Sequence, residues 1–321
     1  MVKTKSGKRP SPLPDILRRY SVFLIFILLC VVFALGSDRF LTPSNLLNVA
    51  LQTSIIAIVA IGMTFTILTA GIDLSVGSIM ALSGALAAGL AVRQGLGTFP
   101  AIGLALIAGM AVGLVNGLLI VKGKMPPFVA TLATMAVARG LTLVYTDGRP
   151  IAGIDESFMF LGTGTVLGIP MPVIIMVVVF VIAYLVLRYT RYGNYVYATG
   201  GNEEVSRLAG IKTNLIIGSV YVVSGLTAAI GGVLLVGRLW SAQPNAAVGL
   251  ELDAIAAPVL GGVSLFGGVG SVTGALVGAF ILGVLSNGLN LMGVPSFYQQ
   301  VIKGVVLILA VMLDLYTKRK R

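Results

Sequence analysis

Apolar stretches long enough to cross a membrane recur along most of this chain. A helix needs about 20 predominantly apolar residues to span a bilayer. Only 10% of the residues are charged, whereas soluble domains carry about 25%. Glycine is abundant, at 41 of 321 residues, and small residues let membrane helices pack closely. The sequence therefore predicts one all-α domain over residues 1–321, a polytopic transmembrane bundle with helices near 20–37, 49–70, 78–92, 99–121, 127–145, 170–188, 215–237, 271–292 and 297–315.

A further apolar stretch, residues 254–266, is too short to span a bilayer as a straight helix. It contains Pro258, Gly261 and Gly262, which interrupt helical structure. Irregular backbone at membrane depth occurs only where protein or a water-filled cavity satisfies its polar groups. We therefore expect a broken or re-entrant element here, which brings the total to about ten crossings.

Lysine and arginine gather in segments that would share one side of the membrane. Basic residues are enriched in the cytoplasmic segments of membrane proteins. If both termini are cytoplasmic, the inner segments hold sixteen of the 22 basic residues, in the leader 1–19 and in 122–124, 188–214 and 318–321. This bias predicts cytoplasmic termini. The first apolar run could be a cleaved signal peptide, but its weak cleavage site favours an uncleaved helix.

The composition argues against several other classes of function. The net charge is +11, but the basic residues sit at the chain ends and in a few loops, so we expect no nucleic-acid partner. Cys30 is the only cysteine and lies in an apolar run, which predicts a packing role. Because the sequence contains no histidine, we expect no catalytic residue, metal site or cofactor.

The ionisable residues indicate where transport energy would come from. Ion-coupled transporters usually carry an acidic residue near the membrane midplane, but here every acidic residue falls in a predicted loop or helix end. Arg139 and Lys303 lie within predicted helices, and we expect both side chains to snorkel to the membrane surface. The chain also lacks the G-x-x-x-x-G-K-S/T loop that binds ATP phosphates. A motor would therefore be a separate ATPase subunit.

Residues 188–214 form the longest charged segment between predicted helices. Within it, Asn202 can cap a short helix with acidic residues in its first turn, and Gly210 can end that helix. Val205 and Leu208 lie on one face of this helix. From the spacing alone, that face could rest on lipid, on its own bundle or on a partner.

Four separated motifs follow in order between about residue 40 and the end of the chain. They are residues 69–78 (TAGIDLSVGS), 200–211 (GGNEEVSRLAGI), 241–262 (SAQPNAAVGLELDAIAAPVLGG) and 287–291 (NGLNL). Their sequence and order resemble the permease subunits of bacterial ATP-binding-cassette (ABC) importers for monosaccharides, the ribose permease group.

This resemblance implies a multi-pass protein of the bacterial inner membrane that works as a pair of identical permeases in the lipid bilayer. It implies a sugar-binding protein outside the membrane that selects the solute. It also implies an ATPase subunit that contacts the segment 200–211, through Gly200, Asn202, Glu203, Glu204, Arg207, Leu208 and Gly210. The implied function is the ATP-driven import of a monosaccharide, with ribose as the first candidate. The alternative is a secondary transporter or facilitator of small polar solutes without an ATPase.

Several polar residues are candidates for the translocation pathway or its gate. Asp73 and Ser75 could share the N-cap of the following helix, or Asp73 could shape a gate at a helix break. Amides within apolar helices commonly bond across helices, but they could also line a passage for sugar hydroxyls. Glu251 and Asp253 are expected in an outer loop, as solvated charges or as contacts for the binding protein. The candidate pathway residues are Asp73, Ser75, Asn116, Asn287 and Asn290.

Overall fold

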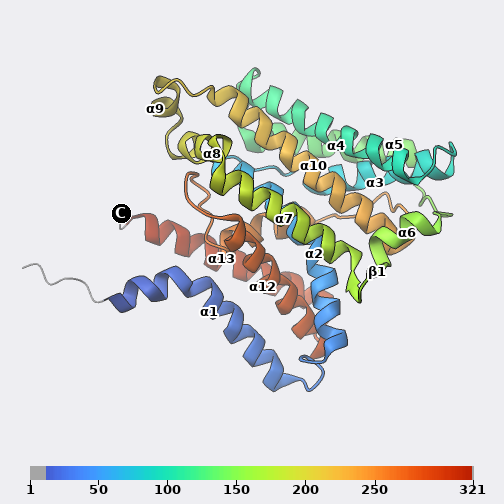
Figure 1. Ribbon diagram of the computed structural model, residues 1–321, viewed down its shortest axis with the longest axis horizontal. Helices are drawn as coiled ribbons and strands as arrows, with labels where there is room; N and C mark the ends of the chain where they lie inside the picture. The colour runs from blue at the N-terminus through green and yellow to red at the C-terminus, as the bar shows by residue number, and fades with distance from the viewer. Residues whose placement is uncertain (1–11, 320–321) are drawn as a thin grey trace, which may run out of the picture.

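Helices make up nearly all of the regular structure in the computed structural model, which describes residues 12–319 (Figure 1). The first helix, α1 (Pro12–Gly36), includes the last part of the predicted basic leader. Residues 1–11 of that leader, and residues 320 and 321, lie outside the described residues. The exception to an all-α fold is a small antiparallel hairpin of β1 (Thr165–Val166) and β2 (Ile169–Pro170).

The predicted polytopic helical bundle is confirmed. Within residues 12–319, six helices are long and apolar enough to cross a bilayer: α2 (Pro43–Leu68), α4 (Thr98–Val121), α5 (Pro127–Thr146), α7 (Met171–Tyr189), α10 (Thr213–Leu239) and α12 (Val272–Leu291). Shorter apolar segments occupy Val22–Gly36 of α1, α3 (Val76–Val92) and Ser296–Met312 of α13 (Ser296–Arg319). Each long apolar stretch of the sequence therefore corresponds to one helix.

Local signals explain where several of these helices begin and end. Proline occupies the first or second position of α2, α5 and α7, where its fixed φ suits a helix start and its missing N–H costs no hydrogen bond. α5 ends at Asp147, which has the left-handed φ of 56°. α7 ends at Thr190, whose side chain accepts the Gly193 N–H and starts α8 (Arg191–Gly201). The charged segment 188–214 is therefore largely helical.

Small residues bring the helices into close contact. α10 packs most extensively against α4, and also against α2 and α3, while α12 packs against α2 and α1. A Cβ at Gly113 of α4 would collide with the Tyr221 carbonyl of α10, and one at Gly225 would collide with the Gly109 carbonyl. The two backbones therefore touch, as they do in many membrane bundles. Figure 1 shows α4 and α5 along one side of the bundle and α1 along the other.

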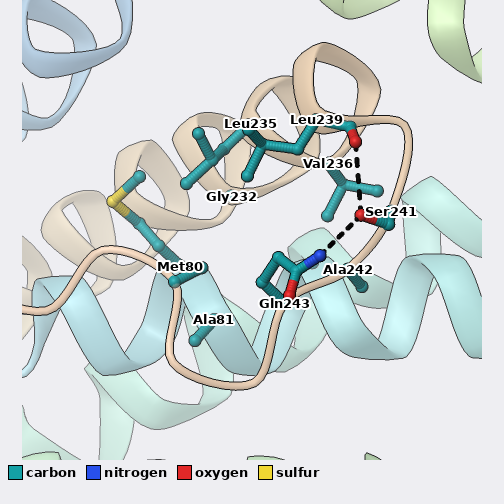
Figure 2. A pocket seen from close by; sticks show the side chains of 11 residues that line it. Met80, Ala81, Gly232, Leu235, Val236, Leu239, Ser241, Ala242 and Gln243 are labelled. Atoms are coloured by element: carbon teal, nitrogen blue, oxygen red, sulfur yellow. Dashed lines mark hydrogen bonds between the residues drawn. The ribbon is translucent and has the colours of Figure 1, made fainter. Parts of the chain in front are cut away.

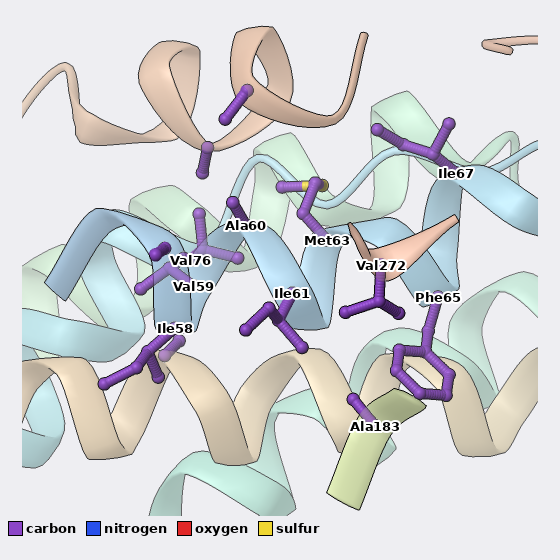
Figure 3. Packing of buried hydrophobic residues seen from close by; sticks show 14 of the residues in the cluster. Ile58, Val59, Ala60, Ile61, Met63, Phe65, Ile67, Val76, Ala183 and Val272 are labelled. Carbon is purple, nitrogen blue, oxygen red and sulfur yellow. The ribbon is translucent and has the colours of Figure 1, made fainter. Parts of the chain in front are cut away.

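The core lies along α2. Figure 3 shows Ile58, Ile61 and Met63 of α2 among Val76 of α3 and Val272 at the start of α12. By contrast, only 22% of the residues in the most apolar window of α7 are buried, compared with 72% in that of α10. An apolar helix with so few buried residues fits a bilayer and not water.

A smaller cluster forms around the end of α1 and the start of α2. Phe33 and Phe40 pack there with Val49, and Cys30 lies against the same cluster. The predicted packing role of Cys30 is confirmed.

The element predicted as broken is more irregular than expected. α11 (Leu250–Leu260) has 11 residues, about 16 Å of helix, which is too short to span a bilayer. Pro258 lies inside it, and Gly262 follows it with a φ of 83°. The helix begins at Leu250 and not near residue 254, and residues 241–249 before it form no long helix. The broken element is therefore an irregular segment followed by a half-length helix.

Short elements occupy the two ends of the bundle. The expected outer loop 146–169 contains α6 (Glu156–Thr163), capped by Asp155, and the β1–β2 hairpin. α9 (Glu203–Leu208) follows α8 in the charged segment. In Figure 1, α9 and the C-terminal end of α13 lie at one end of the bundle, and α6 lies at the other.

Candidate functional site

A buried carboxylate, Asp73, lies in the turn that connects α2 to α3. The residue is fully buried, at 0% exposure, although the sequence places it in a loop. Its Oδ1 accepts the Ser75 N–H at 3.0 Å and the Ser75 hydroxyl, and its Oδ2 accepts the Ser224 hydroxyl of α10 at 2.7 Å. The carboxylate therefore holds the connecting turn in shape and attaches it to α10.

Asn116 of α4 extends this hydrogen-bond network to two more helices. Its amide donates to the Ser75 hydroxyl at 2.8 Å, and its carbonyl accepts the Thr134 hydroxyl of α5. In α5, the Thr131 hydroxyl lies 3.2 Å from the Ile72 carbonyl. The predicted residues Asp73, Ser75 and Asn116 are therefore brought together, in what we call the Asp73 network, together with Thr134 and Ser224.

Ser75 occupies the N-cap position of α3, as predicted, but its side chain forms no capping hydrogen bond. The Ser75 side chain accepts no N–H from the first turn of α3 and donates to Asp73 instead. Asp73 does accept a backbone N–H, that of Ser75 itself, in a two-residue turn. The turn is therefore stabilised by the carboxylate, and the hydroxyl connects the carboxylate to Asn116.

The other two predicted amides lie in α12 and share no hydrogen bond with the Asp73 network. Asn287 and Asn45 of α2 exchange two hydrogen bonds, of 2.9 and 2.8 Å, which join α12 to α2. Asn290 accepts a hydrogen bond of 2.7 Å from Gln299 of α13. Both amides thus act between helices, as one of the two hypotheses expected.

Two cations within helices hold the broken element in place. The Arg139 guanidinium of α5 donates from Nη1 to the Pro244 carbonyl at 2.8 Å and the Ala246 carbonyl at 2.9 Å. Lys303 of α13 forms an ion pair of 2.9 Å with Asp253 of α11. The prediction that both cations snorkel to the membrane surface is therefore wrong, because each has a partner inside the protein.

The acidic residues of α11 also differ from expectation. Glu251 and Asp253 lie in the first turn of α11 and not in a solvated loop, and both are only partly exposed. Glu251 accepts the Gly249 N–H at 3.2 Å and lies close enough to Arg139 to interact with it electrostatically. Gly77 of α3 permits this approach, since a Cβ there would lie 2.6 Å from the Ala247 carbonyl. The start of α11 is thus packed between α3, α5 and α13.

The irregular segment before α11 is closely packed against its neighbours. Figure 2 shows Ser241, Ala242 and Gln243 beside Met80 of α3 and Gly232 of α10. Gln243 donates to the Ser241 hydroxyl at 2.8 Å. The cavity between them holds about 10 Å³, room for one water molecule at most. This packing leaves no space for a sugar at that point.

The short helix in the charged segment matches its prediction. α9 covers Glu203–Leu208, and the Asn202 side chain accepts the Val205 N–H at 2.9 Å as its N-cap. Gly210 follows with a φ of 86°. Val205 and Leu208 are 59% and 81% exposed, so the hypothesis that this face rests on its own bundle is wrong. The apolar face is free to contact lipid or another protein.

Close backbone contacts connect this segment to the turn that holds Asp73. A Cβ at Gly200, at the end of α8, would collide with the Leu68 carbonyl at the end of α2. The same carbonyl accepts the Gly268 N–H at 2.9 Å, and a Cβ at Gly267 would lie 2.7 Å from the Gly200 carbonyl. We call this contact the glycine joint. It brings α8, α2 and the α11–α12 connection together just before residues 69–75.

Comparison with known proteins identifies the family. Residues 45–311 match the family described as the permease component of the branched-chain amino acid transport system. The chain belongs to this permease family. No solved structure matches the permease.

The permease is also similar to sugar permeases along nearly its whole length. It is 51% identical to the ribose import permease protein RbsC of Bacillus subtilis (strain 168), over 93% of each chain. It is 48% identical to the protein of that name from Escherichia coli (strain K12), over 97% of this chain and 98% of the relative. It is 37% identical to the L-arabinose ABC transporter permease protein AraH of Azospirillum brasilense, over 100% of this chain and 98% of the relative. The permease is a multi-pass protein of the bacterial inner membrane.

Several residues of this site were missed by sequence reasoning. Asn45, Thr134 and Ser224 are ordinary polar residues of apolar helices, and only the packing shows that they face a partner. Arg139 carried a usable signal, because an arginine inside an apolar helix is costly unless it is paired.

Proposed function

We propose that this permease is the membrane-spanning subunit of an ATP-driven ABC importer for a monosaccharide, with ribose as the first candidate substrate. The observation that carries the proposal is identity of 48–51% with ribose import permeases over nearly the whole chain. Relatives named for L-arabinose and D-allose transport are 37–38% identical over similar lengths. The higher identity favours ribose over those two sugars.

The topology proposed for the permease has ten crossings with both termini in the cytoplasm. The irregular segment 241–249 and α11 together count as one crossing. Two observations support it: α9 and the C-terminal end share one end of the bundle, and basic residues concentrate in the segments at that end. The resulting orientation places α6 and the β1–β2 hairpin outside.

The permease itself hydrolyses no ATP in this scheme, and a partner ATPase docks on α9. The exposed apolar face of Val205 and Leu208 supports this docking site, together with the charged groups of Glu203, Glu204 and Arg207. An apolar centre with a charged rim is a common arrangement at protein interfaces. A second copy of the permease completes the pathway, and an extracytoplasmic binding protein delivers the sugar.

The glycine joint provides a route from α9 to the pathway. Force on α9 passes through Asn202 to Gly200 in the last turn of α8, which touches the end of α2 at Leu68. Residues 69–75 follow directly and carry Asp73, which is bonded to α10 and linked to α4 and α5 through Ser75 and Asn116. Two backbones in direct contact have no flexible side chains between them, so a displacement of one moves the other. We therefore infer that the Asp73 network is the gate element.

Other polar residues then have supporting roles along the pathway. Asn287 and Asn290 keep α12 in register with α2 and α13 through their amide bonds. Arg139 and Lys303 hold the irregular segment 241–249 and α11 within the membrane, where unpaired carbonyls would be costly. These residues position the pathway and need not grip the sugar tightly, since tight binding would slow release.

One observation favours a second candidate, an ion-coupled secondary transporter. Asp73 is a fully buried carboxylate among membrane helices, and such residues often carry protons or ions. Its oxygens are already engaged by Ser75 and Ser224, which weakens this candidate. A secondary transporter would work without any ATPase, so the two candidates can be separated directly.

The first test is gentle detergent extraction from native membranes, followed by mass spectrometry of the proteins that co-purify. We expect an ATPase with nucleotide-binding motifs in a fixed ratio to the permease. The reconstituted complex, supplied with its binding protein, should then import labelled ribose only with ATP. Purification of the permease alone, combined with ribose uptake that follows an ion gradient without ATP, would overturn the proposal in favour of the secondary transporter.

A further inference from the structure

A polar cavity of about 480 Å³ lies between the end of α7, α8 and the start of α12. It contains no residue of the Asp73 network, of the cation ties to α11 or of α9, so the proposed transport function leaves it unexplained. Its walls are formed by Tyr184, Leu187 and Arg188 on one side and by Asn194 and Tyr197 with residues 270–272 on the other. We propose that this cavity binds the phosphate group of a membrane phospholipid.

The cavity is rich in hydrogen-bond donors and has no acidic residue in its wall. Among the described residues, no carboxylate forms an ion pair with Arg188, so its guanidinium is available. The Asn194 amide and the Tyr184 hydroxyl likewise have no hydrogen-bond partner within residues 12–319, and both line the cavity. Arginine is the side chain best suited to bind phosphate oxygens, because its N–H groups form a planar fork.

The wall opposite Arg188 is held in a defined position. The Tyr197 hydroxyl donates to the Gly270 carbonyl at 3.0 Å, which connects α8 to the residue before α12. The Ser271 side chain accepts the Gly274 N–H at 3.0 Å, which leaves its hydroxyl proton free to point into the cavity. Donors thus approach the cavity from both sides, and a phosphate oxygen can accept from each.

The surroundings indicate a lipid and not a soluble anion. The apolar face of α7 leads directly to the cavity and exposes Val181, Ile182 and Leu185 by 44%, 57% and 49%. Acyl chains can lie along this face while the headgroup enters the cavity. Leu187 and Val272 supply apolar wall for the glycerol region.

Aromatic rings mark the membrane boundary at the level of the cavity. The Tyr184 ring centroid lies 6.0 Å from that of Phe180 and 6.2 Å from that of Tyr189. Tyrosines gather where membrane helices meet the headgroup layer, and basic pockets between helices on the cytoplasmic side bind anionic headgroups.

The test compares two neighbouring arginines in the purified permease. Arg188→Gln removes the guanidinium in the cavity, and Arg191→Gln removes one that does not line it. Both variants and the unchanged protein would be titrated with phosphatidylglycerol in detergent, and bound lipid would be counted by native mass spectrometry. We expect Arg188→Gln to weaken lipid retention about tenfold, as for the loss of a charge-assisted hydrogen bond, and Arg191→Gln to leave it unchanged.

Further arms identify the ligand chemistry. Diacylglycerol with the same acyl chains should be retained no better by the unchanged protein than by Arg188→Gln, because it lacks the phosphate. Inorganic phosphate should fail to displace the lipid at millimolar concentration. If it binds while phosphatidylglycerol does not, the lipid assignment is overturned. Equal losses in both arginine variants would overturn the site itself, since they would indicate only general attraction to positive charge.

A second variant protects the test against a folding defect. Asn194→Leu changes the opposite wall and should also weaken retention of phosphatidylglycerol, while the thermal midpoint without added lipid stays unchanged. Full retention by a folded Asn194→Leu and a folded Arg188→Gln would refute the proposal. The measurement uses no ATP and no transport, so its result is independent of the importer function.

Discussion

The ammonium group of Lys303 in α13 lies 2.9 Å from a carboxylate oxygen of Asp253 in the first turn of α11. The two side chains are 25% and 20% exposed, so both are largely withdrawn from solvent. Together with the bonds from Arg139 to Pro244 and Ala246, this pair anchors the broken element to helices on two sides. The element is therefore held by charged groups that the surrounding apolar residues cannot replace.

Removal of one member of this pair should lower the free energy of unfolding more than removal of both. Asp253→Ala leaves the Lys303 ammonium without its partner among apolar side chains, and we expect a loss of about 1–2 kcal/mol because the pair is partly screened. The double variant with Lys303→Ala should recover part of that loss. Unfolding of the purified variants in detergent measures both effects. Strictly additive losses would show that the pair has no coupling.

Loss of the Asp73 carboxylate should destabilise the protein and stop transport. Asp73→Ala leaves the buried Ser75 N–H and two hydroxyls without their acceptor, which we expect to cost about 2–4 kcal/mol. Ser224→Ala removes one bond to a buried carboxylate oxygen and should lower the free energy of unfolding by about 1.5–3 kcal/mol. Thermal unfolding and sugar uptake in vesicles are the readouts. An Asp73→Ala protein with unchanged stability and uptake would rule out the network as a gate element.

Two adjacent glycines offer a matched test of the glycine joint. A Cβ at Gly200 would collide with the Leu68 carbonyl, whereas a Cβ at Gly201 would meet open space. Gly200→Ala should therefore separate α8 from α2 and lower uptake severely, while Gly201→Ala should behave like the unchanged protein. Uptake per inserted molecule, with insertion checked by immunoblot, measures the difference. Equal uptake by the two variants would remove the joint from the coupling route.

The exposed face of α9 should matter for ATPase association and not for folding. Leu208 is 81% exposed, so Leu208→Ser should leave the thermal midpoint unchanged but weaken ATPase co-purification about tenfold, as for an apolar interface residue. Leu167, at 98% exposure in the β1–β2 hairpin at the opposite end, provides the control. Leu167→Ser should retain the ATPase. If both variants or neither lose it, α9 is not the docking site.

Much of the fold could be predicted because the signals are local. Apolar runs of sufficient length locate the helices, and prolines mark several starts. The α9 helix was predicted almost to the residue, because its cap, its first-turn acids and its terminating glycine lie within nine positions, 202–210. The segment before α11 was harder, since its shape depends on Arg139, more than 100 positions away in the chain.

In the candidate site, too, the local signals were predictable and the distant partners were not. Asp73 and the amides were recognised as unusual because polar groups in or beside apolar helices need partners. Their partners were not predictable, since Ser224 lies 151 positions from Asp73 and Asn45 lies 242 from Asn287. Arg139 and Lys303 were assigned to the membrane surface because helical distance alone allowed it. Packing brought acceptors within reach and changed that outcome.

The sequence by itself determined that this chain is a membrane-spanning helical bundle, how its basic residues are distributed and which family its motifs resemble, because these properties depend on runs and short motifs along one chain. Tertiary structure decided which polar groups are buried, which carbonyls the cations bind and which backbones touch at the glycine joint. Those outcomes depend on helices that meet after large separations in the chain, and a hydrogen bond forms only when packing brings donor and acceptor to about 3 Å.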